Sequence, residues 1–554
     1  MKRDIGQLAA PEQDVLIVGG GIHGAALAHA CARLGMRVAL VEQGDFGQAT
    51  SANSLKIMHG GLRYLQHLNI RRMRDSILAR RDMLRLAPHC VKPLSCLIPN
   101  YGRGVRGNLA MRCALWLNDL IGWDRNRGVA VDRRLPPGRI LSRAQARQLL
   151  TGISSGDPAG ASLWYDALAV NTERLTLSFV QAAVDLGARA ANYAQATRIL
   201  FDQGRVTGAV VRDRESGREV TVRARTVVNA GGPWLEKILD QAGLTRFPAA
   251  GWAKAVNIVV RKTFWGNYAV GLTGEPGFAD RDALVRKKGR FFFFVPWRGY
   301  TMIGTTYRPF TGSPQDLRPE TKDIEELLLE VNRMYPPARL TLADVTLVHA
   351  GLVPMAATGA DSGDEVQLVK ESEVIAHGSA DSGHRGLYSI SGVKYTTAPR
   401  VAMAAAKTLR RYLAREHGWQ PAIRSKKVAG TSGQDVARPP LPPAFSFLSE
   451  RYGPRATLVH GFIQMNSRAL SEAPPLYLGE IDYFLAEEMA LSLADVVCRR
   501  CELASAQCPP AEILEAIARH MAAVRNWDTQ RIQIEIRAVR EIFAPLHPAG
   551  GQCR

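Results

Sequence analysis

Two short apolar runs, separated by a helical stretch of small residues, open this 554-residue chain. The first run, Val15 to Val18, has no polar position, which is typical of a strand buried on both faces. Alanines recur through 25–32, Gly35 ends that stretch, and the second run covers Val38 to Val41. The order of strand, helix and strand predicts a βαβ unit over residues 14–45.

Glycines and one acid stand where such a unit binds a dinucleotide. Gly19, Gly21 and Gly24 follow the first strand with G-x-G-x-x-G spacing, and Glu42 ends the second strand. The glycines make the tight turn, let backbone N–H groups approach a pyrophosphate and let the helix pack on the strand, and the acid accepts hydrogen bonds from a ribose. An isolated glycine motif can be a plain loop, but the complete unit predicts dinucleotide binding.

The rest of the chain carries the patterns of further regions. Short β-type runs between 197 and 230 end in an apolar strand, as in a β-meander that returns to a parallel sheet. Residues 253–310 are rich in β-branched and aromatic side chains, which favours an antiparallel sheet. A segment with five prolines, 420–445, precedes a last block with apolar residues at helical spacing.

The composition is that of a globular protein, with 46% hydrophobic and 22% charged residues. No apolar run approaches the roughly 18 residues of a spanning helix, and residues 1–13 lack the apolar core of a signal peptide, so we expect an intracellular protein. The eight cysteines are too scattered for a disulfide framework. Cys498, Cys501 and Cys508 fall in or beside a helical pattern without a second ligand pair, and no metal site is expected.

Positive charge is concentrated in one region. The formal net charge is +20, and residues 61–150 carry 18 basic and 5 acidic side chains. Within them, 68–87 has the pattern of an amphipathic helix with several arginines, and 109–123 combines large apolar residues with two tryptophans. Such a surface suits docking on an anionic membrane. A solvated arginine face over a buried helix fits equally well, whereas nucleic-acid binding is not expected because no nucleic-acid module accompanies the charge.

Four strings of residues resemble one flavoenzyme family. The string ATSANSLKIMHGGLRYLQ, residues 49–66, is similar to the signature of FAD-dependent, respiratory glycerol-3-phosphate dehydrogenases, and the likeness continues at 227–234, 295–306 and 391–397. The resemblance implies FAD rather than NAD as the cofactor and a small-molecule secondary alcohol as the substrate. It also implies quinone as electron acceptor and a position on the inner face of the cytoplasmic membrane.

The resemblance further implies roles for individual residues. A flavin alcohol dehydrogenase must hold the substrate C–H against the flavin, remove the hydroxyl proton and stabilise negative charge on the reduced ring. Arg63, Tyr64 and Lys394 correspond to family positions that face substrate and flavin, and the cation Lys394 suits the third task. The residues expected to bind the cofactor are Gly19, Gly21, Gly24, Glu42, Thr50, Ser51, Ser54, Lys56, His59, Gly60, Gly61, Gly231, Gly392 and Thr396.

Several positions around the substrate depart from the family pattern. Val353 stands where the family has an arginine that grips the substrate phosphate, and Lys370 replaces a second arginine, which keeps the charge but loses the bidentate fork. Asn257 replaces a histidine proposed as the proton acceptor, and an amide cannot take that proton at neutral pH. His349 is a candidate substitute for it.

Together these inferences predict an α/β fold with a discontinuous Rossmann-like FAD-binding domain, an antiparallel-sheet substrate domain and a C-terminal α-helical cap domain. The expected ranges are 1–80, 156–246 and 347–415 for the first, 81–155 and 247–346 for the second, 416–445 for a Pro-rich linker and 446–545 for the helical domain. The predicted function is oxidation of a secondary alcohol, best matched by sn-glycerol 3-phosphate, with electrons passed to quinone or another acceptor. Two alternatives stay open: an FAD enzyme acting on another small anionic hydroxy or amino compound, and a flavin- or nucleotide-binding protein without turnover that acts through its basic surface.

Overall fold

The structure is a computed structural model of the whole chain. It describes residues 1–67, 69–102, 107–154, 156–244, 250–274, 291–356, 366–378, 383–421, 441–472 and 475–544, and no side-chain placement is described for Arg63, Gln66 and His67. The centre of the expected Pro-rich linker, 422–440, therefore lies outside the described residues, as does the side chain of Arg63.

A six-stranded sheet contains both strands of the predicted βαβ unit. Its strand order is β17-β18-β11-β1-β2-β7, and all pairs are parallel except β17 with β18. Every residue of β1, β2 and β11 is buried, which explains why these strands contain no polar alternation. The strands are β1 (Val15–Val18), β2 (Val38–Val41), β7 (Arg189–Ala191), β11 (Val227–Asn229), β17 (Glu373–Ala376) and β18 (Leu387–Ser391).

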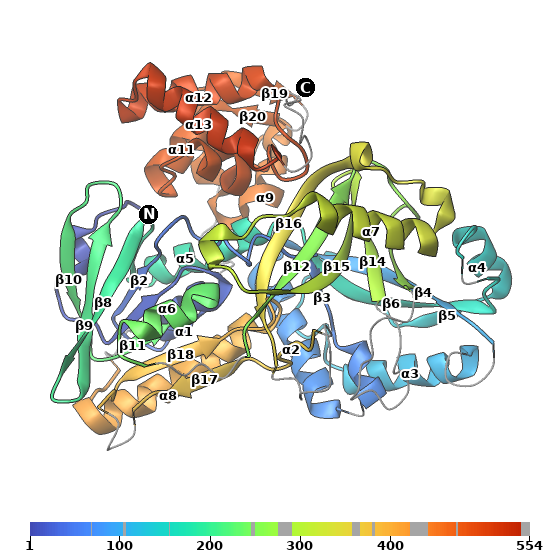
Figure 1. The fold of residues 1–554 in the computed structure, drawn as a ribbon, viewed down its shortest axis with the longest axis horizontal. Coiled ribbons are helices and arrows are strands. Elements are labelled where there is room, and N and C mark those ends of the chain that lie inside the picture. The colour runs from blue at the N-terminus through green and yellow to red at the C-terminus, as the bar shows by residue number, and fades with distance from the viewer. Residues whose placement is uncertain are drawn as a thin grey trace.

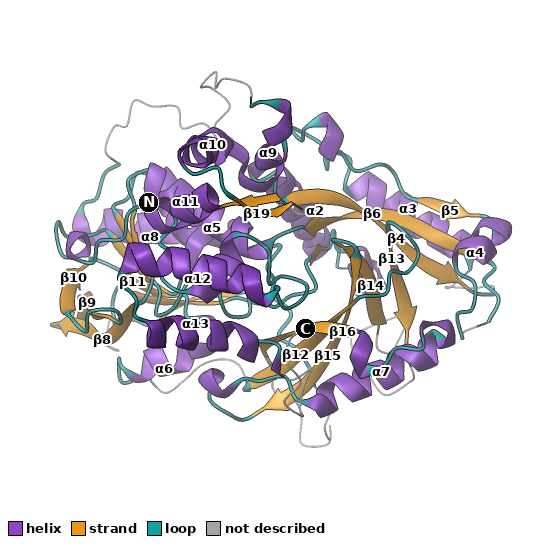
Figure 2. Ribbon diagram, turned by 90° about the horizontal axis from the view of Figure 1, so that it is seen from above, coloured by secondary structure: helices purple, strands orange, loops and turns teal. Residues whose placement is uncertain are grey.

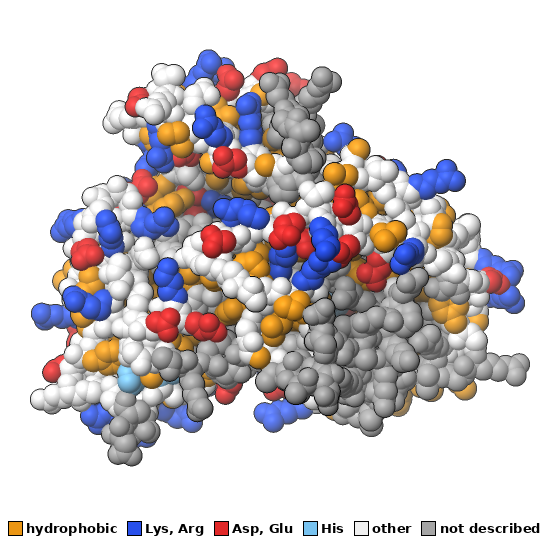
Figure 3. Space-filling view, in the orientation of Figure 1, with side chains coloured by type: hydrophobic (Ala, Val, Ile, Leu, Met, Phe, Trp, Pro, Cys, Tyr) orange, Lys and Arg blue, Asp and Glu red, His pale blue; other side chains and the backbone are white. Residues whose placement is uncertain are grey.

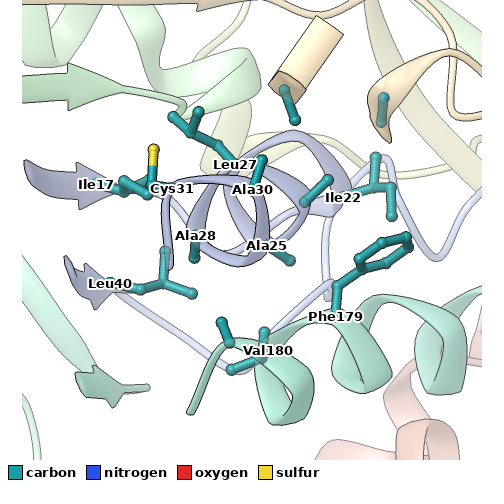
Figure 4. Close-up of a cluster of buried hydrophobic side chains, with 14 of the residues drawn as sticks. Ile17, Ile22, Ala25, Leu27, Ala28, Ala30, Cys31, Leu40, Phe179 and Val180 are labelled. Atoms are coloured by element: carbon teal, nitrogen blue, oxygen red, sulfur yellow. The ribbon is translucent and has the colours of Figure 1, made fainter. Parts of the chain in front are cut away.

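Helix α1 (Ile22–Arg33) is buried between this sheet and two further helices, α5 (Thr172–Asp185) and α8 (Ala398–His417). Its alanines let the neighbouring elements approach closely, and Figure 4 shows Ala25 and Ala28 of α1 above Phe179 and Val180 of α5. The predicted βαβ unit is thereby confirmed. The predicted meander is confirmed as well, with β8 (Ala194–Asp202), β9 (Arg205–Asp213) and β10 (Glu219–Arg223) as an antiparallel sheet before β11.

A second sheet, called the large sheet here, has nine strands and is mainly antiparallel. Its order is β16-β12-β15-β14-β13-β4-β6-β3, with β5 paired to β6. Helix α7 (Thr321–Met334) packs its apolar face on this sheet (Figure 2). The strands are β3 (Ile57–Met58), β4 (Val91–Asn100), β5 (Arg139–Leu141), β6 (Gly160–Ala169), β12 (Trp252–Val260), β13 (Tyr268–Thr273), β14 (Phe291–Trp297), β15 (Tyr300–Phe310) and β16 (Val345–Pro354).

Strands β3 and β6 and most of β16 fall inside the ranges predicted for the FAD-binding domain. The chain thus crosses between the two sheets more often than those ranges imply, while the ranges themselves stay a prediction. Beside the large sheet lie α2 (Ile70–Leu86), α3 (Asn108–Ile121) and α4 (Arg143–Leu149), and α6 (Leu235–Asp240) follows β11.

The C-terminal region is a helical domain that rests on both sheets, drawn in orange and red at the top of Figure 1. One hydrophobic cluster joins its Tyr483 and Phe484 to Trp164 and Trp297 of the large sheet. It contains α9 (Phe447–Tyr452), α10 (Ala456–Met465), a hairpin of β19 (Ala469–Glu472) and β20 (Pro475–Tyr477), α11 (Leu478–Glu487), a π-helical segment (Asp495–Arg500), α12 (Ala511–Arg525) and α13 (Thr529–Glu541). No helix among the described residues is long and apolar enough to cross a membrane.

Candidate active site

A cavity of about 1440 Å³ lies between the six-stranded sheet and the nine-stranded sheet. Part of its lining comes from the glycine turn at 18–23, the segment 47–59, the turn after β11 and the segment 392–397. Strands β12, β14, β15 and β16 form another part of the lining. Segments far apart in the chain therefore share one chamber, the usual arrangement of a cofactor and substrate site between domains.

The glycine turn has the shape that a dinucleotide requires. Gly19 has φ +113°, and a Cβ there would lie 2.4 Å from the carbonyl oxygen of Ala230. A Cβ on Gly24 would lie 1.8 Å from the carbonyl oxygen of Gly19, so Gly24 is needed for packing of α1 and does not line the cavity. Gly21 does line the cavity, and its Cβ would meet only the hydroxyl of Ser51 at 3.2 Å. Gly19 and Gly24 thus serve the fold, and Gly21 keeps the cavity open.

Polar groups around this turn fit the cofactor. The carboxylate of Glu42 accepts the N–H groups of Gly20 at 2.6 Å and Gly44 at 2.9 Å; burial raises its pKa, and these bonds oppose the shift. Ser51 accepts the N–H of Ile22 at the start of α1 at 3.0 Å. His23, a residue that the sequence analysis missed, lines the cavity with a buried Nε2 that has no hydrogen-bond partner in the described part of the chain. Burial lowers its pKa to about 4.

The segment after the turn is fixed by protein contacts. The Thr50 hydroxyl donates to the carbonyl oxygen of Leu352 at 3.0 Å and accepts its N–H at 3.1 Å, which ties this segment to β16. Ser54 accepts the N–H of Lys56. The Lys56 ammonium lies 3.2 Å from the Glu173 carboxylate; burial lowers the pKa of Lys56, against the pull of Glu173. Thr50, Ser54 and Lys56 line the cavity, but these polar groups bind the protein itself.

A histidine–aspartate pair stands in the wall formed by β6. The Nδ1 of His59 lies 3.0 Å from Asp166, whose side chain is 4% exposed, whereas that of His59 is 48% exposed and lines the cavity. Asp166 also accepts the N–H of Gly60 at 2.7 Å and forms a buried ion pair with Arg80. Burial alone would raise the pKa of Asp166, but the hydrogen bond from His59 and the charge of Arg80 hold it below its usual range.

Glycine is also required beside this pair. Gly60 does not line the cavity. A Cβ there would lie 2.2 Å from the Arg80 guanidinium, so only glycine fits at this position. Gly61, which lines the cavity, has φ +86°. Gly231, Gly392 and Thr396 line the cavity too, and a Cβ on Gly392 would lie 2.4 Å from the His23 ring.

Cations gather around one tyrosine on the α2 side of the cavity. The Lys394 ammonium lies 4.5 Å from the ring centre of Tyr64, and the Arg72 guanidinium lies 4.8 Å from it. Arg72 also donates to the backbone carbonyl of Lys370 and pairs with Glu371 at 3.1 Å. Tyr64, Arg72, Lys370 and Lys394 all line the cavity, which gives this wall a positive character.

The large sheet forms a further part of the lining, and its two lining residues that depart from the family pattern, Asn257 and Val353, carry no charge. Asn257 lines the cavity and accepts the hydroxyl of Thr305 at 2.6 Å, and Val353 lines it as well. His349 is paired with Asn257 across β12 and β16 but is not among the cavity-lining residues. Burial, and next the charge of nearby Lys56, lower the pKa of His349 to about 4. Arg308 turns to Glu326 of α7 instead of the cavity.

Family models match both the main part and the C-terminal part of the chain. A family model described as FAD dependent oxidoreductase matches residues 14–408, and one described as the C-terminal domain of alpha-glycerophosphate oxidase matches residues 437–532. A glycerol-3-phosphate dehydrogenase of Mycobacterium leprae is 30% identical over 97% of this chain and 89% of its own length. One of Synechocystis is 28% identical over 91% of each.

The chain belongs to the glycerol-3-phosphate dehydrogenase family of FAD-dependent oxidoreductases. Its fold matches the solved structure of a Bacillus halodurans glycerol-3-phosphate dehydrogenase complexed with FAD, with a TM-score of 0.69, 22% identity and coverage of 99% and 98% of the two chains. The resemblance, the fold class and the FAD cofactor expected from the sequence are thereby confirmed.

Proposed function

We propose that this enzyme oxidises the secondary hydroxyl of glycerol 3-phosphate, or of a close anionic analogue, to a ketone. The observation that carries the proposal is the His59–Asp166 pair, which lines the same cavity as the Lys394–Tyr64–Arg72 cluster. Bound FAD would supply the acceptor for the hydride that leaves the substrate carbon. The protein must then accept the proton of the substrate hydroxyl and bind the anionic group of the substrate.

His59 is the residue best suited to accept the hydroxyl proton. Asp166 engages its Nδ1, fixes the ring and stabilises the imidazolium, which leaves Nε2 for the substrate. Asn257 cannot accept a proton, and His349 is a weaker base that does not line the cavity. The role that the sequence analysis considered for His349 therefore passes to His59.

The cation cluster is suited to the anionic end of the substrate. The Lys394 ammonium and the Arg72 guanidinium lie 4.5 and 4.8 Å from the ring centre of Tyr64, and Lys370 lines the same cavity. Val353 gives no such contact, so phosphate recognition here depends on lysines more than on an arginine fork. That departure favours, as a second candidate, another small anionic hydroxy or amino compound.

Anaerobic reduction of the bound flavin tests both candidates. The purified holoenzyme is mixed with glycerol 3-phosphate, glycerol, small hydroxy acids and amino acids, and loss of the yellow absorbance is followed. We expect bleaching by glycerol 3-phosphate with formation of one equivalent of ketone. Bleaching by a different compound alone would favour the second candidate, and no bleaching by any of them would favour a binding protein without turnover.

We also propose that the enzyme docks on an anionic membrane through α3 and passes its electrons to quinone. Large apolar side chains on one face of α3 and just beyond its end are exposed: Leu109 by 75%, Trp116 by 67%, Leu120 by 54% and Trp123 by 74%. The other face of α3 contributes Met111 to the cavity wall. An apolar surface with tryptophans and nearby exposed arginines is the pattern of interfacial binding.

Part of the positive charge in this region is internal. Arg74 and Arg81 both pair with Asp124, and Arg80 is buried against Asp166. On the face of the molecule in Figure 3, basic and acidic side chains are interspersed. The apolar stripe of α3 is therefore a stronger argument for docking than the net charge.

Co-sedimentation with liposomes of phosphatidylcholine and phosphatidylglycerol tests the docking surface. Wild type should bind at low salt, and Trp116→Ser/Trp123→Ser should not. Leu329→Ser is the matched control, because it removes an apolar side chain that is 53% exposed on α7. Equal binding by all three proteins would contradict docking through α3. Loss of binding as salt rises from about 0.1 M to about 1 M would show that electrostatic attraction to the anionic lipid also contributes to binding.

A further inference from the structure

Two arginines between Cys498 and Cys501 reach out of the C-terminal domain to the cofactor side. The Arg499 Nε lies 2.6 Å from Asp45, and the Arg500 guanidinium makes two bonds to the same carboxylate, at 2.7 and 2.8 Å. Asp45 is fully buried and Arg500 is 1% exposed. Burial alone would raise the pKa of Asp45, but the two arginines hold it well below its usual range.

Asp45 lies in the middle of a cavity wall without facing the cavity. Residues 41–43 and 47–51 line the cavity on either side of it. The same segment is bonded to the glycine turn, through Glu42 to the N–H of Gly20 and through the N–H of Gly47 to the carbonyl oxygen of Gly20 at 3.0 Å. Asp45 thus joins the C-terminal domain to a segment that lines the cavity beside the glycine turn.

A second contact reinforces the first. The Arg500 guanidinium also donates to the carbonyl oxygen of Glu488 at 2.8 Å, and Glu488 forms a buried ion pair with Arg174 in the first turn of α5. Glu173, the residue before Arg174, forms the ion pair with Lys56 at the cavity. Buried charges of this kind are strongly destabilised when one partner is lost, so the network resists displacement of either segment.

We propose that the C-terminal helical domain is a positioning element for the cofactor: Arg499 and Arg500, acting through Asp45, hold the segment 42–51 against bound FAD. This role concerns cofactor retention and is independent of which substrate is oxidised. It also gives a physical function to the cysteine-flanked segment, whose arginines, and not its thiols, make the contact.

Release of FAD from the holoenzyme is the test. Arg499→Gln is the first variant, because this side chain is 12% exposed and its loss leaves Arg500 paired with Asp45. Arg500→Lys is the second; it keeps the charge but loses the bidentate fork. Arg525→Gln is the control, since Arg525 links the same domain to Glu215 near β10 at 2.8 Å, away from the cavity.

After dilution, the rise of flavin fluorescence gives the release rate, and thermal unfolding with and without added FAD gives the stability. We expect release to be faster by about tenfold or more in Arg499→Gln and Arg500→Lys and unchanged in Arg525→Gln, with most of the affinity change in the release rate. A tenfold weaker affinity lowers the FAD-dependent part of the stability by about 1.4 kcal/mol, whatever happens to the apoprotein. If the two variants unfold more easily but release FAD at the wild-type rate, the arginines only join domains and the proposal is wrong.

Discussion

Replacing His59 by glutamine separates proton transfer from the other tasks of the site. The amide can stay hydrogen-bonded to Asp166, but it cannot accept the substrate proton. General-base catalysis contributes about 10²–10⁴-fold, which corresponds to about 2.7–5.4 kcal/mol of the barrier. We expect flavin reduction to slow by that factor, while FAD content and substrate binding change little.

The contacts of Asp166 explain why His59, and not Asp166, is the residue to replace. Asp166 accepts the indole N–H of Trp164 at 3.2 Å and the N–H of Gly60, and it neutralises Arg80. Its loss would leave a buried guanidinium without its partner, at a cost of about 3–5 kcal/mol, and would report on folding. His59 is half exposed and carries no such charge partner beyond Asp166 in the described part of the chain.

Anaerobic stopped-flow measurement of flavin absorbance at saturating substrate gives the rate. A His59→Gln enzyme that reduces its flavin at the wild-type rate would remove His59 from the reaction. Absorbance per protein controls for FAD content.

Four further predictions follow from the site. Gly21→Val should fold but purify without yellow colour, because Gly21 has an ordinary φ of −70° and its side chain would enter the cavity beside Ser51; full colour would contradict the role of this turn. Lys394→Met should retain FAD but slow its reduction about a hundredfold in stopped flow, as expected when one stabilising charge is removed; an unchanged rate would exclude it from the site. Val353→Arg should tighten glycerol 3-phosphate about tenfold to a hundredfold, the value of one charge-assisted hydrogen bond, as measured by titration of flavin absorbance. His349 has a folded-state pKa of about 4, below the unfolded value of about 6.5, so its burial costs about 2 kcal/mol of stability as the pH falls from about 7 to about 5; urea unfolding of His349→Gln should show a smaller loss over that window, and an equal loss would mean that His349 is not the titrating group.

The parts of the fold that could be predicted are those set by short-range patterns. The βαβ unit and the meander each depend on fewer than about forty consecutive residues, and strand length, glycine turns and alternation specify them locally. Membership of the large sheet could not be predicted in this way. Strand β6 pairs with β4, β3 and β5, and β16 pairs with β12, through contacts that join distant parts of the chain.

In the candidate site, too, the residues of contiguous motifs could be predicted, whereas pairs of residues far apart in the chain could not. Gly21, Tyr64 and Lys394 could be named because each lies in a contiguous motif, and all three line the cavity. The partner of His59 is 107 residues away in the chain, so the pair could not be recognised from the motif. The link from Asp45 to Arg500 spans 455 residues, and no local pattern around either residue indicates the other as its partner.

The distribution of cations makes position 353 informative about how the substrate lies. Among the described cavity-lining residues, the strands of the nine-stranded sheet contribute no lysine or arginine, whereas Arg72 and Lys394 meet at Tyr64, and Lys370 follows Val369, whose N–H donates to the carbonyl oxygen of Pro354 beside Val353. An anion held at Tyr64 alone gains nothing from an arginine at 353, but an anion that reaches the segment beside Val353 gains a direct partner. Tighter binding by Val353→Arg would therefore mean that the phosphate points to the sheet and that the wild-type enzyme holds it weakly. No gain would mean that the phosphate lies among the cations beside Tyr64, and the apolar wall around Val353 would then face the other end of the substrate.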